Sequence, residues 1–226
     1  MTLLIVRHGQ AGNNLPTFRP GSIKDEEIPL TALGIEQAIT LSFWLRQSFN
    51  LTNCRQYSSF FLRAQMTESL AGISSQHHIH DEALNEHDFG LFMSSNPPEN
   101  LRTEFDTQFP LSISCLAPGG SSIIDDYHQA HSFLTRVVRR SMRHDIVLFT
   151  HGFKAAVLRM VLEGIPPTDA GWTKIYQQKQ RLNNCGVIIY PSPSIPKPGD
   201  TNGKCLALVN APYPQMLDLQ FEPYTC

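Results

Sequence analysis

Short apolar runs alternate with longer amphipathic segments along most of this chain. Residues 3–6 and 146–149 are unbroken apolar runs rich in branched side chains, which is typical of strands buried on both faces of a sheet. Further strands are expected at residues 55–60, 187–190 and 205–209. The Pro/Gly-rich loop 191–203 joins the last two strands, which we expect to form an antiparallel edge.

Capping residues and apolar spacing place the helices. Thr31 can cap a helix that runs through Phe49, in which Ala38, Leu41 and Leu45 recur at near-helical spacing. Ser121 or Ser122 follows the turn Pro118-Gly119-Gly120 and can cap a helix that runs to about Met142. Shorter helices are expected at residues 63–73, 99–106 and 155–162.

The alternation of strands and helices predicts an α/β fold with a largely parallel sheet. The chain shows no internal repeat and no linker between domains, so we expect one domain over residues 1–226. Pro97, Pro98 and Pro110 interrupt its middle, where we expect an irregular insertion at about residues 77–118.

Composition excludes several classes of protein. With 41% hydrophobic and 17% charged residues, the 226-residue chain is too apolar and too weakly charged to be disordered. A net charge of −2 gives no general attraction to nucleic acid or to anionic membranes, so we expect neither as a partner. No apolar run approaches the ~18–20 residues of a membrane span. Five cysteines without a CxxC spacing indicate free thiols, and without a secretory signal we expect a cytoplasmic protein.

Two segments of the chain have the same sequence pattern. Arg7-His8-Gly9 and His151-Gly152 each place a histidine directly after a buried strand and before a glycine. In an open α/β sheet, ligands bind at the carboxyl ends of the strands. Both histidines are therefore expected at the same edge of the sheet, where the fold can bring them close together.

Several ordered motifs resemble those of the histidine phosphatase superfamily, which includes the phosphoglycerate mutases. Arg7-His8-Gly9-Gln10 with Asn14 resembles the opening signature of that family. The further motifs are Leu30-Thr31 with Gly34, Gln37 and Ala38; Ser59 with Arg63, Ala64 and Thr67; Leu84 to Gly90; Pro118 to Ser121; Thr150-His151-Gly152; and Asn184 to Val187. The resemblance implies a phosphoglycerate mutase-like fold, a three-layer α/β/α arrangement around a mostly parallel central sheet.

The resemblance also implies roles for particular residues. His8 is the expected nucleophile, which forms a phosphohistidine and so divides one difficult transfer into two steps. Arg7 and Arg63 supply forked donors for phosphate oxygens, while Asn14 and Gly152 complete the expected phosphate site. His151 is expected to take part in catalysis and, if protonated, to add a third cation. Glu86 matches the position of the proton donor.

Three functions remain open at this point. The interval between Glu86 and His151 is short, whereas phosphoglycerate mutases typically carry a long insertion there, which favours a metal-independent phosphomonoesterase of the histidine acid phosphatase type. The alternatives are phosphoryl transfer of the mutase type and a non-catalytic phosphate-binding protein on the same fold. We expect a small phosphorylated substrate and no cofactor.

The nature of the substrate is not decided by the sequence. Apolar side chains at Phe18, Phe89, Phe92, Met93 and Phe105 favour an aromatic or alkyl group, whereas Arg19, Lys24 and Arg102 favour a second acidic group.

A run of histidines, His77-His78-Ile79-His80, raises the alternative of a metal site. Adjacent histidines on a strand point to opposite faces, and no second ligand cluster stands at a recognisable spacing. We therefore expect no metal and interpret the run as a strand with polar neighbours.

Overall fold

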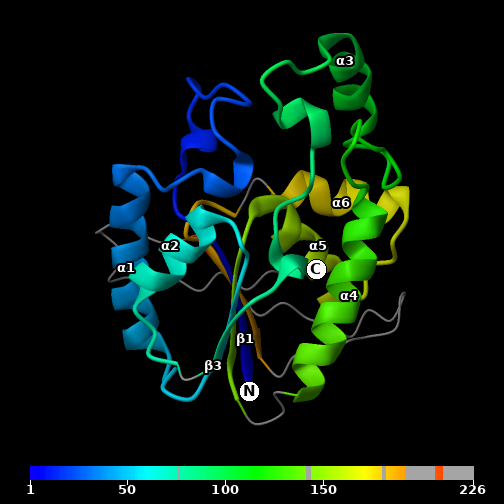
Figure 1. Cartoon of the computed structure of the whole chain (residues 1–226). Coiled ribbons are helices and arrows are strands. Elements are labelled where there is room, and N and C mark those ends of the chain that lie inside the picture. Colours follow the sequence, from blue (N-terminus) through cyan, green and yellow to red (C-terminus); the bar gives the residue numbers. More distant parts are fainter. Residues whose placement is uncertain (76, 141–143, 180–181, 192–206, 211–226) are drawn as a thin grey trace.

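A six-stranded mixed sheet runs through the centre of the protein, in the order β3-β2-β4-β1-β5-β6 (Figure 1). The computed structural model describes residues 1–75, 77–140, 144–179, 182–191 and 207–210. The strands are β1 (Thr2–Arg7), β2 (Arg55–Ser58), β3 (His77–His80), β4 (Ile146–Thr150), β5 (Val187–Pro191) and β6 (Ala207–Val209). The first four pair in parallel, while β5 is antiparallel to both of its neighbours, as predicted for this edge.

Helices cover both faces of the sheet, with α1 and α2 on one face and α4, α5 and α6 on the other (Figure 1). Their bounds are α1 (Ala32–Ser48), α2 (Leu62–Ala71), α3 (Glu99–Gln108), α4 (Ile123–Arg140), α5 (Gly152–Leu162) and α6 (Asp169–Lys179). Successive residues of β1 point into two separate cores, Leu3 and Ile5 into one and Leu4 and Val6 into the other. The fold is therefore a three-layer α/β/α sandwich, as predicted.

The predicted helix starts are confirmed by their hydrogen bonds. The Thr31 hydroxyl accepts from the backbone N–H of Gly34 at 3.1 Å and begins α1. Before α4, the Ser122 hydroxyl accepts from the N–H of Asp125, and the Asp125 carboxylate accepts from the N–H of Ser122. This reciprocal pair satisfies two backbone donors that the helix itself leaves unpaired.

Residues 77–80, interpreted as a strand with polar neighbours, form β3 at the edge of the sheet, so the irregular insertion begins after them and not at residue 77. This strand pairs on one side and its side chains are largely exposed, so it lacks the apolar pattern of a buried strand. The structure differs from the predicted elements at α6. Helix α6 was not predicted, although Trp172 and Ile175 lie three residues apart and are both buried. Most of the predicted loop 191–203 and the start of the predicted strand 205–209 lie outside the described residues.

The parallel strands determine where a site can form. The carboxyl ends of β1, β2 and β4 meet at one edge of the sheet, at the top of Figure 1. Two segments extend beyond this edge, the one that joins β1 to α1 and the one that contains α3. In the part of the chain that the structure describes, no helix has the length and apolarity needed to cross a membrane.

Candidate active site

His8 and His151 lie side by side, as the two matched strand ends predicted. Parallel pairing of β1 with β4 sets Arg7 opposite Thr150, so the residue that follows each strand is a histidine at the same level. The N–H of His8 donates to the Thr150 carbonyl at 2.9 Å, and the two imidazole rings are 5.0 Å apart between centroids.

The surroundings of His8 fix its proton on one nitrogen. Its Nδ1 lies 2.7 Å from the carbonyl oxygen of Gly9, which can only accept a hydrogen bond. Nδ1 therefore carries the proton, and Nε2 of the neutral ring keeps its lone pair. Burial, and then the positive charges of Arg63 and Arg7, hold the pKa of His8 well below its ordinary value. His8 is thus a neutral imidazole near pH 7 with Nε2 available for attack.

Two arginines flank His8, of which Arg63 is fully buried and Arg7 is partly buried. Arg63, fully buried in the first turn of α2, lies 3.1 Å from the carboxylate of Asp25 and also donates to the Asp25 carbonyl. Arg7 donates to the carbonyl of Leu182 at 2.7 Å. Burial lowers the pKa of Arg7 while Glu86 and Cys185 oppose that shift. The Nε atoms of both arginines are buried without a hydrogen-bond partner among the described residues, so each keeps a donor for an anion.

Glu86 is held at the start of helix α5. Its Oε1 accepts the backbone N–H of His87 at 3.0 Å and that of Lys154, in the first turn of α5, at 3.2 Å. A carboxylate at a helix N-terminus satisfies backbone donors that the helix leaves unpaired. The position of this side chain is therefore set by two backbone groups.

A buried ionic network connects His87 and Lys154, whose backbone N–H groups hold Glu86. Asp126 on α4 binds Nδ1 of His87 at 2.7 Å with one oxygen and Nζ of Lys154 at 2.8 Å with the other. Burial alone would raise the pKa of Asp126, but His87 and Lys154 together outweigh it and lower the pKa. One carboxylate thus joins the two residues whose N–H groups hold Glu86.

His151 lies behind His8 rather than on the cavity wall. Its Nε2 is 2.8 Å from the Ser59 hydroxyl, which itself donates to Asn85 at 2.9 Å, so Nε2 is the donor to Ser59. Burial and then Arg63 and His8 hold the pKa of His151 well below its ordinary value. A fully buried imidazole next to two arginines favours its neutral form, whereas the third cation was expected only if His151 is protonated.

Asn14 and Gly152 both lie at the cavity. The Asn14 side-chain oxygen accepts from the N–H of Ala11 and from the Asn184 amide, which leaves the Asn14 amide nitrogen to donate. Gly152 begins α5, and a Cβ at this position would lie 3.6 Å from Nε of Arg7. The first turn of α5 therefore comes close to the guanidinium of Arg7.

These groups surround a cavity of about 440 Å³. Of the predicted site residues, Arg7, His8, Asn14, Arg63, Glu86 and Gly152 line it. Its outer wall contains Phe18, Phe89, Met93, Arg102 and Phe153. Phe92 and Phe105, which we expected here, are buried in the core beneath it, and Arg19 and Lys24 are not among its lining residues.

The sequence analysis did not identify two functional neighbours. Asp25 was not identified as the partner of Arg63, and Ser59 was named in a motif without a role. Asp126 carried a signal that could have been found, because it stands on the buried face of α4 with Ile123, Tyr127 and Ala130. A charged residue at such a position requires a buried partner.

Comparisons with known proteins agree with this geometry. The model of the histidine phosphatase superfamily (branch 1) matches residues 3–188. The protein belongs to this superfamily. A curated relative from Rhizobium johnstonii, a 2,3-bisphosphoglycerate-dependent phosphoglycerate mutase, is 33% identical over 171 residues, which cover 72% of this chain and 79% of the relative. The relative of the same name from Methylorubrum extorquens is 31% identical over 172 residues, with the same coverage.

Solved structures of other proteins share the fold. The mycobacterial glucosyl-3-phosphoglycerate phosphatase has a TM-score of 0.69 at 17% identity and covers 93% of this chain and 99% of its own. A phosphoserine phosphatase from Entamoeba histolytica has a TM-score of 0.67 at 23% identity, covering 89% of this chain and 98% of its own. At these identities the similarity supports the fold alone.

Proposed function

We propose that this protein hydrolyses phosphomonoesters through a phosphohistidine on His8. The observation that supports this most is the joint placement of a neutral, buried His8 with two arginines and Glu86 around one cavity. Phosphoryl transfer depends mainly on positioning and on stabilisation of charge, and these residues supply both.

In the first step, Nε2 of His8 attacks phosphorus and the ester P–O bond breaks. Protonated Glu86 gives its proton to the departing alkoxide, which leaves as an alcohol. Arg7 and Arg63 stabilise the negative charge on the transferring phosphoryl oxygens. In the second step, Glu86, now a carboxylate, removes a proton from water, the oxygen of that water attacks phosphorus, and the P–N bond breaks to release inorganic phosphate.

The cavity wall supports a monoester with an apolar group. Phe18, Phe89 and Phe153 form much of the wall beyond the arginines. Arg102 also belongs to this part of the wall, and its Nε lies 3.4 Å from a carboxylate oxygen of Asp106, which offsets its positive charge. Aromatic and alkyl phosphates are accordingly the first substrates to test.

The names of the curated relatives favour a second candidate, phosphoglycerate mutase activity. Both reactions use the same phosphohistidine and differ in its acceptor, which is water in a phosphatase and a bound phosphoglycerate in a mutase. Assays with 3-phosphoglycerate, primed by 2,3-bisphosphoglycerate, therefore belong beside the hydrolysis assays.

The experiment is turnover of p-nitrophenyl phosphate in EDTA, with and without vanadate. We expect metal-independent turnover that vanadate inhibits, that His8→Ala abolishes and that His128→Ala, at an exposed histidine on α4, retains. Equal turnover by His8→Ala contradicts the proposal. Formation of 2-phosphoglycerate faster than release of inorganic phosphate supports the mutase, and vanadate binding without turnover of any substrate supports a binding protein.

A further inference from the structure

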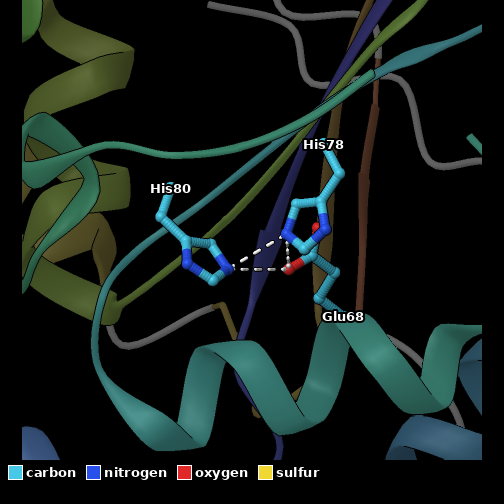
Figure 2. A group of neighbouring side chains, drawn as sticks. All are labelled: Glu68, His78 and His80. Atoms are coloured by element: carbon cyan, nitrogen blue, oxygen red, sulfur yellow. Dashed lines mark hydrogen bonds and ion pairs between the residues drawn. The ribbon is translucent and has the colours of Figure 1, made fainter. Parts of the chain in front are cut away.

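Glu68, His78 and His80 bring three metal-ligating atoms together outside the catalytic cavity (Figure 2). Nε2 of His78 lies 3.0 Å from Oε2 of Glu68 and 3.0 Å from Nε2 of His80. Nε2 of His80 lies 3.8 Å from the same carboxylate oxygen. Figure 2 shows the two rings turned toward each other and the Glu68 side chain rising from the helix below them.

The fold explains why these side chains meet. His78 and His80 are two residues apart on β3, so both point to the same face of the sheet. Glu68 comes from α2, on the face that α1 and α2 cover. The sequence analysis considered adjacent histidines, which point to opposite faces, and so overlooked His78 and His80, which are two residues apart. It also could not identify the third ligand, Glu68, which lies on a different element.

The separations fit a tetrahedral ion. With metal–ligand distances of about 2.0–2.1 Å, two ligands of a tetrahedral zinc ion are about 3.3–3.4 Å apart. The three observed separations, 3.0, 3.0 and 3.8 Å, lie on both sides of that value. Three protein ligands leave the fourth position of the ion for water.

Charge and burial favour a cation at the same point. Glu68 is 6% exposed, and its ion-pair partners among the described residues are His78 and His80, which are charged only when protonated. A buried carboxylate needs a compensating charge, and a divalent ion held by the same three side chains supplies it. The side chains of His78 and His80 are 48% and 31% exposed, so an ion can enter from solvent.

We propose that Glu68, His78 and His80 bind a divalent transition-metal ion, and that zinc fits the site best. Two imidazole nitrogens exclude the oxygen-selective ions Mg²⁺ and Ca²⁺, and the tetrahedral spacing favours zinc. The ion joins edge strand β3 to helix α2, whose first turn carries Arg63. The site is separate from phosphoryl transfer, since none of its residues lines the catalytic cavity.

The test is zinc binding by the full chain after treatment with chelator. Isothermal titration with Zn²⁺, and metal analysis after gel filtration, should give one equivalent bound and a raised melting temperature. The double variant His78→Ala/His80→Ala should lose this equivalent. His77→Ala should retain it, because this histidine lies on the same strand but on the opposite face.

Glu68→Gln provides a second variant of nearly the same shape, and it should weaken zinc binding by at least tenfold. With Co²⁺, the wild type should give the strong visible absorption of a tetrahedral site and the double variant should not. Absence of binding by the wild type, or an equivalent retained by the double variant, overturns the proposal, as does its loss in His77→Ala. None of these readouts requires catalytic turnover, so they stand independently of the proposed phosphatase activity.

Discussion

One hydrogen bond and burial leave Nε2 of His8 unprotonated and able to act as a nucleophile. The Gly9 carbonyl holds the proton on Nδ1, and the arginines beside the ring disfavour a second proton. The same arginines that bind phosphate thus keep the nucleophile neutral. Proton transfer to the leaving group is left to Glu86.

Replacing Glu86 by Gln should have an effect that depends on the leaving group. We expect the first turnover of an alkyl phosphate to slow by about 10²–10⁴-fold, because the alkoxide loses its proton donor. The first turnover of p-nitrophenyl phosphate should change far less, since p-nitrophenolate leaves without a proton. Rapid-quench measurement of both substrates checks this, and equal losses with both would contradict the role of Glu86.

Asp25 competes with phosphate for Arg63. Its carboxylate is 3.1 Å from the guanidinium and carries the same charge as the substrate. In Asp25→Asn we expect vanadate to bind about tenfold more tightly, or ~1.4 kcal/mol. Without vanadate, the variant should unfold at a lower temperature, because a buried cation has lost its partner.

Titration with vanadate and thermal unfolding measure these two effects. Glu26→Gln is the matched control, because this exposed neighbour belongs to the same short helix, Asp25–Glu27. Vanadate binding that stays unchanged or weakens in Asp25→Asn would show that Asp25 does not compete.

At the scale of elements, helices α4 and α5 are joined by the ionic network behind Glu86. Asp126 on α4 connects His87 with Lys154 on α5, and the backbone of both residues holds Glu86. The network therefore couples the packing of two helices to the position of the proton donor.

Asp126→Asn should displace Glu86 while leaving His8 in place. We expect kcat for an alkyl phosphate to fall by about tenfold, because a small displacement of Glu86 slows proton transfer to the leaving group. KM and the first turnover of p-nitrophenyl phosphate should be largely retained, because p-nitrophenolate leaves without a proton. His128→Ala is the control, because His128 is exposed on the same helix. Equal loss of both activities in Asp126→Asn would indicate a structural role instead.

The elements also show what could be predicted from the sequence. Strands β1 and β4 were predictable because they are buried on both faces and so form continuous apolar runs. Strand β3 has no such run, so its histidines were interpreted as a strand but its place at the edge of the sheet was not predicted. The placement of His8 and His151 side by side was predicted because each directly follows a strand, whereas the contacts of Asp25 and Asp126 join distant elements and were not.

At the scale of the whole molecule, two neutral histidines at the centre make stability depend on pH. The pKa values of His8 and His151 are lowered in the folded protein, mainly by burial. In the unfolded chain both take up protons below about pH 6.5, while in the folded protein they do not. The unfolded state then binds more protons, so stability falls as pH falls below that value.

Denaturant unfolding at pH 7.5, 6.5 and 5.5 should show this loss. Each of the two histidines contributes up to about 1.4 kcal/mol per pH unit below pH 6.5. His8→Gln should reduce the slope, whereas His128→Gln, at an exposed position, should reduce it less. A stability that is flat from pH 7.5 to 5.5 would contradict neutral histidines in the core of the site.

The central claim is that Nε2 of His8 carries the phosphoryl group during turnover, and locating that group tests it most directly. The protein would be mixed with an aryl phosphate and quenched in base, where phosphohistidine survives. Peptide mass spectrometry and phosphorus NMR would then locate the group. The geometry predicts phosphorylation of His8 at Nε2, since Nδ1 is bonded to Gly9. A phosphoryl group on another residue, or on Nδ1, or its absence from an enzyme that turns over, would contradict the account.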